Sequence, residues 1–175
     1  MPDLRTERLV LRAPQPADAR ALHAICADPD VTRYLKWAPH VHMNQTLEYL
    51  VRAEGLEGRG KGYAWIIERD GRVVGCASAC AEEQHSAIFG GFFAREHWRS
   101  GYGLEAARAV LEWLQANPRI ERVSAQSDVR NQAVAVLLSR IGMHCEGKLA
   151  SAWPGFGEPA RDVYTWAWVR KGSDV

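Results

Sequence analysis

Polar and apolar residues alternate along several short stretches of the chain, with the two-residue period of strands that bury one face. The alternation is clear in Arg8–Arg12 and in Arg161–Val169, where Tyr164, Trp166 and Trp168 fall on one face. One more strand is expected shortly before the last, and others over Tyr63–Arg69, Arg72–Ala81, Ser86–Phe93 and Arg119–Ser127. An Asp-Gly pair separates the strands at 63–69 and 72–81, which is typical of a two-residue hairpin turn.

Four other stretches carry the spacing and end signals of helices. Helices are expected over Ala17–Ala27, Asn44–Glu57, Gly101–Ala116 and Asn131–Ile141. Asn44 is the expected N-cap of the second helix, and a short turn over Val31–Leu35 precedes it. Pro118 follows the third helix and Gly142 the fourth, as residues that terminate helices commonly do.

The predicted elements follow the order βααβββαβαββ, with helices interspersed through a mainly antiparallel sheet of about seven strands. This order indicates the α/β (α+β) class. A length of 175 residues lies within the usual size of one domain, about 100–200 residues. No repeat or linker divides the sequence, so we expect residues 1–175 to form a single domain.

Positive and negative charges are nearly balanced, with 22 Lys and Arg against 21 Asp and Glu. A protein that mainly grips nucleic acid or an anionic membrane needs a clustered basic excess, so neither partner is expected. No stretch approaches the roughly 18 apolar residues of a membrane span, and the N-terminus lacks the apolar core of a secretion signal. We therefore expect a cytoplasmic protein whose four cysteines are buried free thiols.

The segment from Trp98 to Ala106 places two glycines where a loop becomes a helix. Because they lack Cβ atoms, Gly101 and Gly103 let the backbone approach a ligand closely, and the first amides of a helix have no internal acceptor. Such amides form an anion site that suits a pyrophosphate, and Arg99 adds positive charge beside it. The alternative is a helix start eased by glycine that binds nothing.

A dinucleotide-binding fingerprint is a second interpretation of the same residues. Gly101, Gly103 and Ala106 match its spacing, and Glu121 lies about 20 residues further on, as the fingerprint requires. Those glycines should directly follow a strand, whereas the loop Ala94–Ser100 intervenes, and Glu121 lies near the start of a strand rather than at its end. A nucleotide-dependent oxidoreductase is therefore the less favoured interpretation.

Short motifs spread over nearly the whole chain occur together in one known family. They lie at residues 6–12, 28–35, 71–75, 101–106, 131, 141–143 and 162–164. In this order they resemble the GCN5-related N-acetyltransferases (GNAT), and among them the RimJ/RimL type that acetylates the N-termini of ribosomal proteins. The resemblance implies a twisted, mostly antiparallel sheet with helices on both faces. It also implies direct transfer of an acetyl group from acetyl-CoA to a primary amine in a ternary complex.

The resemblance implies roles for individual residues as well. The fourth strand of the family fold splays from the fifth, and the pantetheine arm of acetyl-CoA lies in the gap. The residues that this places at the cofactor are Phe92, Phe93 and Ala94 along pantetheine, Arg99, Ser100, Gly101, Tyr102 and Gly103 at the pyrophosphate, and Asn131 near the thioester.

Four positions depart from the motifs of the family. Trp98 replaces the Arg or Gln that usually begins the phosphate loop. Val134 stands where the subgroup has a serine, which removes one hydrogen bond to the cofactor. Leu138 stands where many relatives have a tyrosine that protonates the leaving thiolate, and Met143 replaces an aromatic residue in packing.

Attack of an amine on a thioester needs a neutral amine and stabilisation of the developing oxyanion. The expected oxyanion donor is a backbone N–H near Phe92 or Phe93. An α-amine, with a reference pKa near 8, is partly neutral at pH 7. A lysine amine, with a reference pKa near 10.4, needs more help from the enzyme to lose its proton. Ser127 and Asp128, at the end of the strand beside the inferred thioester, are the candidate bases, acting through a water. With Asn131 they are the candidate catalytic residues.

Two segments are expected to border the acceptor cleft. Their aromatic and histidine residues are Tyr34, Trp37, His40, His42, Trp153 and Phe156. Acidic residues that could receive a cationic amine are Glu82, Glu83 and Glu158. No His and Cys spacing forms a ligand set, so no metal is expected.

The motifs leave the acceptor open, because a fold does not set a substrate. A protein N-terminal α-amine, an antibiotic and a polyamine all agree with the motifs. A non-catalytic domain that binds or senses acyl-CoA is the main rival to an enzyme. The oligomeric state, monomer or homodimer, is open too.

Overall fold

The computed structural model describes residues 2–82 and 85–171. Its strands are β1 (Leu4–Arg5), β2 (Val10–Arg12), β3 (Gly62–Arg69), β4 (Arg72–Ala81), β5 (Ser86–Phe93), β6 (Arg122–Asp128), β7 (His144–Trp153) and β8 (Arg161–Val169). Its helices are α1 (Ala19–Cys26), α2 (Pro29–Thr32), α3 (Met43–Gly58), α4 (Tyr102–Ala116) and α5 (Gln132–Arg140), with short 3-10 helices η1 (Pro16–Asp18) and η2 (Arg95–His97).

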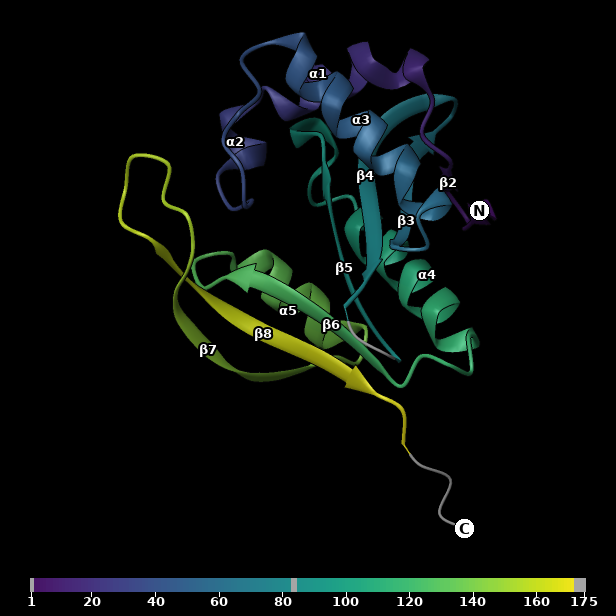
Figure 1. Cartoon of the computed structure of the whole chain (residues 1–175), viewed down its shortest axis with the longest axis vertical. Coiled ribbons are helices and arrows are strands. Elements are labelled where there is room, and N and C mark those ends of the chain that lie inside the picture. Colours follow the sequence, from purple (N-terminus) through teal and green to yellow (C-terminus); the bar gives the residue numbers. More distant parts are fainter. Residues whose placement is uncertain (1, 83–84, 172–175) are drawn as a thin grey trace.

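The strands form one sheet in the order β1-β2-β3-β4-β5-β6-β8-β7 (Figure 1). Every neighbouring pair is antiparallel except β5 and β6, which run parallel. The predicted α/β class and mostly antiparallel sheet are confirmed. The described residues form eight strands rather than about seven, because Leu4 and Arg5 pair with the outer edge of β2.

Alternation along the central strands divides the core between two faces of the sheet. Trp65 and Ile67 are fully buried on the face that packs against Val110 of α4. Ile66, between them, is buried on the opposite face with Leu22 of α1. The helices therefore cover both faces, with α1 and α3 on one side and α4 on the other.

Two helix starts differ from the sequence prediction. The N-cap of α3 is His42 and not Asn44, because Gln45 Oε1 accepts the backbone N–H of Val41 at 2.7 Å and of His42 at 2.9 Å. The predicted turn over Val31–Leu35 overlaps the end of the one-turn helix α2, which Pro29 begins. Prolines are tolerated at the first helical position, where the missing N–H has no helical partner.

The most consequential feature of the sheet is the short pairing of β5 with β6. Only Ser86, Ala87 and Ile88 of β5 pair with β6 in the described residues. Beyond them, β5 continues along β4 to Phe93, while β6 continues along β8 to Asp128. The two strands thus diverge in the middle of the sheet, as the sequence resemblance implied.

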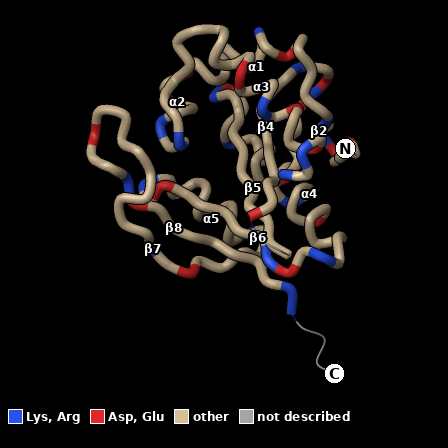
Figure 2. The backbone as a smooth tube through the Cα atoms, in the orientation of Figure 1, with Lys and Arg blue, Asp and Glu red and all other residues tan. Residues whose placement is uncertain are grey.

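Charged residues are interspersed along the backbone (Figure 2). Among the described residues, no helix is long and apolar enough to cross a membrane. All four cysteines are free. Cys26 and Cys76 are buried as expected, and burial raises the pKa of Cys76 to about 11. Cys145 is exposed, so the expectation of a buried thiol is wrong there, because it lies on the edge strand β7, whose side chains are mostly exposed.

Neighbouring glycines on β5 offer a matched test of how closely the strand packs near the divergence. A Cβ atom on Gly91 would lie 2.6 Å from the carbonyl oxygen of Cys76, whereas a Cβ on Gly90 meets no atom within 4 Å. We expect Gly91→Ala to lower the free energy of unfolding by about 1–3 kcal/mol, because the backbone of β4 cannot yield. Gly90→Ala should change it far less. Urea denaturation of both variants is the measurement, and equal losses would contradict this packing.

Candidate active site

The loop before α4 has the backbone geometry of an anion site. Gly101 is the N-cap of α4 and has φ +84°, a left-handed conformation that favours glycine. Arg99 is exposed and has φ +61°. Because Gly101 has no side chain to cap the helix, the amides of the first turn, including that of Gly103, are left for a ligand.

An arginine from the N-terminal segment anchors this loop. Arg8 donates to the carbonyl of Ser100 at 3.0 Å, forms an ion pair with Glu105 at 2.7 Å and lies 4.6 Å above the ring of Tyr102. Burial would raise the pKa of Glu105, but hydrogen bonds from Thr6 and Arg8 outweigh it and hold the pKa below its ordinary value. The ring of Tyr102 is buried, so this residue offers a ligand only its backbone.

The end of β5 forms one side of the gap. Phe92 packs edge-on against Trp37, with 5.6 Å between ring centroids, and Ala94 is buried. Trp98 donates its indole N–H to the carbonyl of Phe93 at 3.0 Å. The unusual tryptophan of the phosphate loop therefore ties that loop to the end of β5, and it already occupies one of the backbone groups expected to contact pantetheine.

Three predicted catalytic residues lie at the end of β6 and the start of α5. Ser127 is buried, and its hydroxyl accepts the indole N–H of Trp166 at 3.0 Å. Asn131 is the N-cap of α5, where its Oδ1 accepts the backbone N–H of Val134 at 3.3 Å. Asp128 lies between them in the sequence, at the tip of the strand. The structure thus brings the three residues to one end of the gap, opposite the end of β5.

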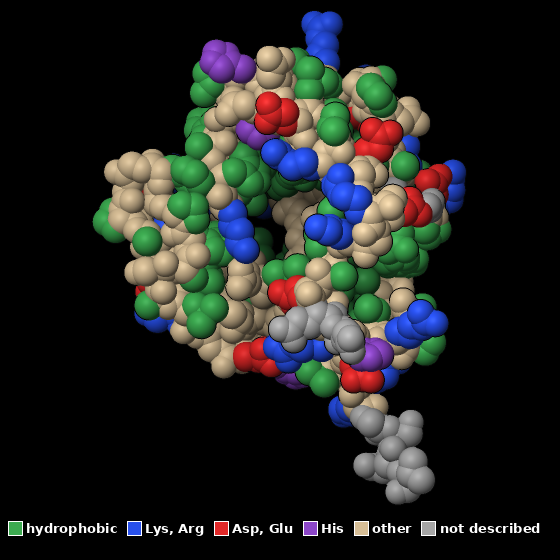
Figure 3. Space-filling model, in the orientation of Figure 1, with side chains coloured by type: hydrophobic (Ala, Val, Ile, Leu, Met, Phe, Trp, Pro, Cys, Tyr) green, Lys and Arg blue, Asp and Glu red, His purple; other side chains and the backbone are tan. Residues whose placement is uncertain are grey.

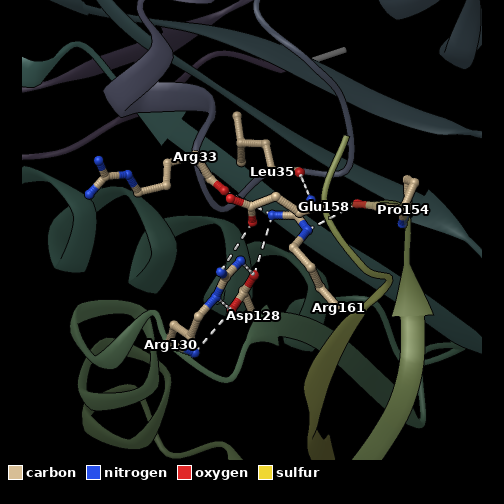
Figure 4. Close-up of polar contacts among 7 residues, drawn as sticks. All are labelled: Arg33, Leu35, Asp128, Arg130, Pro154, Glu158 and Arg161. Carbon is tan, nitrogen blue, oxygen red and sulfur yellow. Dashed lines mark hydrogen bonds and ion pairs between the residues drawn. The ribbon is translucent and has the colours of Figure 1, made fainter. Parts of the chain in front are cut away.

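Asp128 is held by two guanidinium groups (Figure 4). Its side chain is fully buried. Arg130 donates to both carboxylate oxygens at 2.9 Å, and Arg161 donates to Oδ2 at 3.3 Å. Burial would raise the pKa of Asp128, but hydrogen bonds and charge from Arg130, with the charge of Arg161, hold it below its ordinary value. A carboxylate in this state is a weak base.

Arg161 also joins three parts of the chain that are distant in sequence. Its guanidinium donates to the carbonyls of Arg33 at 2.8 Å and Pro154 at 3.0 Å, and to that of Leu35 (Figure 4). The residue is buried although arginine is normally exposed. One side chain therefore fixes the segment after α2 and the β7–β8 loop against the tip of β6.

A pocket of about 440 Å³ opens between these segments. The space-filling view shows the molecule hollowed near its centre, with hydrophobic and basic side chains around the hollow (Figure 3). The pocket is lined by Thr32, Arg33, Tyr34, Trp37, Ala38, Pro39, Arg130, Gly155, Phe156, Glu158 and Arg161. Since Trp37 contacts Phe92 and Arg130 binds Asp128, the pocket reaches both diverging strands.

Several residues expected near the acceptor do not line this pocket. His40 packs behind Trp37, with ring centroids 4.8 Å apart, and burial lowers its pKa. Trp153 is buried and donates to Gln126 at 3.1 Å. Glu82 accepts a hydrogen bond from Ser124, where β5 and β6 are still paired.

Three further expectations concern His42, Glu83 and a metal site. His42 is exposed at the start of α3 and does not line the pocket. Glu83 lies outside the described residues. Within residues 2–82 and 85–171, no group of three or more His, Cys, Asp or Glu could hold a metal ion.

The sequence predicts a role for neither of the arginines that hold Asp128. A signal was present for Arg161, which shares the inward face of β8 with the fully buried Val163, and an arginine at such a position needs a buried partner. No comparable signal marks Arg130, which follows β6 in a turn and resembles any surface arginine.

We expect Arg161→Gln to lower the free energy of unfolding by about 2–4 kcal/mol, because it leaves buried carbonyls without a donor and weakens the ion pair of Asp128. Arg130→Gln is the matched control. Its side chain is 49 % exposed, and in that variant Asp128 keeps Arg161, so the loss should be smaller. Chemical denaturation compares the two, and a larger loss for Arg130→Gln would contradict the bridging role of Arg161.

Comparison with known proteins agrees with this geometry. The model of the acetyltransferase (GNAT) domain matches residues 8–144. An uncharacterized N-acetyltransferase, p20 of Bacillus licheniformis, is 26 % identical over 175 residues, covering 98 % of each chain.

Solved structures are similar as well. A structure of RimL, the ribosomal L7/L12 α-N-protein acetyltransferase with coenzyme A, superposes with a TM-score of 0.87 at 21 % identity, covering 96 % of this chain and 98 % of that one. Spermidine N-acetyltransferase from Vibrio cholerae, solved with CoA and spermine, superposes with a TM-score of 0.81 at 18 % identity, covering 94 % and 96 %. These identities show a shared fold only. The family match spans most of the sequence, and the chain belongs to the GNAT acetyltransferases.

Proposed function

We propose that the protein transfers an acetyl group from acetyl-CoA to a primary amine by direct attack in a ternary complex. The observation that carries this proposal is the divergence of β5 and β6 beside the uncapped N-terminus of α4. An extended pantetheine arm fits between the diverging strands, and a pyrophosphate fits the helix amides. The divergence lies beside the pocket of about 440 Å³ that could hold an acceptor, because Trp37 of the pocket packs against Phe92 of β5.

Individual residues take the following roles in the proposal. The backbone from Phe92 to Ala94 lies along pantetheine, and the segment from Arg99 to Gly103 surrounds the pyrophosphate. Asn131 lies near the thioester and can offer it its amide N–H donors, because its oxygen is used to cap α5. A backbone N–H near Phe92 or Phe93 stabilises the oxyanion.

The chemistry needs no strong base. The amine nitrogen bonds to the acetyl carbon, the carbon–sulfur bond breaks, and the amine loses one proton as CoA leaves with its thiol. Ser127 and Asp128 remain the candidates to take that proton through a water, but the ion pairs of Asp128 keep its basicity low. The reaction therefore rests on alignment and on the neutral fraction of the amine, which favours an α-amine.

Two relatives with this fold have different acceptors in their names, the ribosomal protein L7/L12 and spermidine. We infer a RimJ/RimL-like protein that acts in the cytoplasm as one domain over residues 1–175, alone or as a homodimer. Its acceptor is a protein N-terminal α-amine or a small-molecule amine.

A non-catalytic acyl-CoA sensor is the second candidate. Leu138, in place of the tyrosine that protonates the thiolate, and the paired state of Asp128 favour it.

Binding of CoA is the first test. Thermal unfolding with CoA or acetyl-CoA at a hundredfold excess over Kd should show about 2.7 kcal/mol of stabilisation, and NAD should give none. Arg99→Glu should weaken CoA binding about tenfold or more, because it places a carboxylate beside a phosphate. Arg119→Glu, an exposed reversal just after α4, is the matched control. No shift with CoA, or equal weakening in both variants, would contradict the proposed phosphate site.

Turnover separates the enzyme from the sensor. Release of CoA thiol should depend on an added amine, and initial rates with both substrates varied should give intersecting lines, as a ternary complex requires. Parallel lines would indicate a covalent acetyl-enzyme instead. CoA binding with no turnover of peptides or small amines would favour the sensor.

A further inference from the structure

The cluster of Arg130, Asp128 and Arg161 carries more positive than negative charge. Two guanidinium groups share one carboxylate, and the carboxylate is fully buried beneath them. Arg161 is only 6 % exposed, whereas Arg130 is 49 % exposed and lines the pocket. The unit of positive charge that Asp128 does not balance therefore faces the pocket through Arg130.

The hydrogen bonds of the cluster show which N–H group is left for a ligand. Arg161 gives its donors to Asp128 and to three backbone carbonyls. Arg130 uses Nε and Nη2 on Asp128. Its Nη1 has Glu158 as an anionic neighbour at 3.8 Å, which is too long for a hydrogen bond.

Glu158 is a weak and displaceable partner. It lies in the β7–β8 loop, its side chain is 69 % exposed, and exposed ion pairs of this length add little to stability. Among the residues described around the pocket it is also the only acidic one, against three arginines. A polycationic acceptor would find one carboxylate here, whereas an anionic group would find a guanidinium aligned by Asp128.

Part of the pocket wall is aromatic. Tyr34, Trp37 and Phe156 contribute aromatic rings, and the guanidinium of Arg130 lies 5.7 Å from the ring of Tyr34. We propose that the acceptor is an amine that also carries a carboxylate, which Arg130 Nη1 binds in place of Glu158 while the aromatic wall takes the apolar part. This inference rests on the proposed acetyl transfer and narrows its substrate class.

Matched acceptors test it in the wild-type enzyme. The acceptors are phenylalanine and 4-(aminomethyl)benzoic acid, which differ in the spacing of amine and carboxylate. Each acid is compared with its own primary amide. Spermidine is the polycationic acceptor. For at least one pair, kcat/KM should be about tenfold or more higher for the acid, since a charge-assisted hydrogen bond is lost in the amide. Equal or higher values for both amides, or for spermidine, would overturn the proposal.

Variants test whether Arg130 causes the preference for the acid over its amide. Arg130→Gln should remove most of the difference between acid and amide. Arg122→Gln should keep it, because Arg122 is paired with Glu146 at the other end of β6, about 20 Å away. Glu158→Gln, at an exposed position, should lower KM for the acid about twofold or more and leave the amide unchanged. Loss of the preference in Arg122→Gln, or its persistence in Arg130→Gln, would overturn the assignment.

A binding measurement separates this inference from the proposed activity. The N-acetylated acids and their N-acetylated amides are added to the protein with and without CoA, and thermal unfolding is followed. The acid of at least one pair should raise Tm more than its amide, and Arg130→Gln should abolish the difference even if no amine is turned over. Equal shifts for acid and amide would overturn the carboxylate site, whereas failure of CoA to bind would contradict only the proposed function.

Discussion

The separation of β5 from β6 after three paired residues is the constraint on which the rest of the structure depends. Central strands of a sheet normally satisfy each other's backbone groups along their whole length. Beyond Ile88 of β5 and Ser124 of β6 this pairing stops, while each strand keeps its outer neighbour. The sheet thereby contains an internal edge, and an extended ligand with amide groups can serve as the missing strand.

An internal gap requires something else to hold its two sides at a fixed distance, and Arg161 does so. Its buried guanidinium contacts the tip of β6, the segment after α2 and the β7–β8 loop. Burying a charge is costly unless it is paired and hydrogen-bonded, and here each guanidinium nitrogen donates to Asp128 or to one of three backbone carbonyls. The same contacts determine the chemistry, because the ion pairs that make Asp128 a structural anchor also lower its pKa and its basicity.

The sequence predicts features that depend on neighbouring residues, such as turns and helix caps, better than contacts between distant residues. The Asp-Gly turn has positive φ at both residues, and Gly101 and Asn131 cap their helices as local chemistry requires. His42 displaces Asn44 as N-cap because Gln45, three residues on, supplies the capping oxygen. The partner of Arg161 could not be predicted, since Asp128 lies more than 30 positions away and no periodicity links the two residues.

Because Asp128 is a weak base, the reaction depends on an amine that loses its proton readily before it attacks. A carboxylate on the acceptor would by itself raise the pKa of that amine, because a nearby negative charge favours the ammonium form. In the proposed complex the guanidinium of Arg130 cancels this effect by pairing with the carboxylate. Arg130 would then do two things through one contact: select the acceptor, and increase the fraction of it that is neutral. Asp128 contributes to both by holding Arg130 in place.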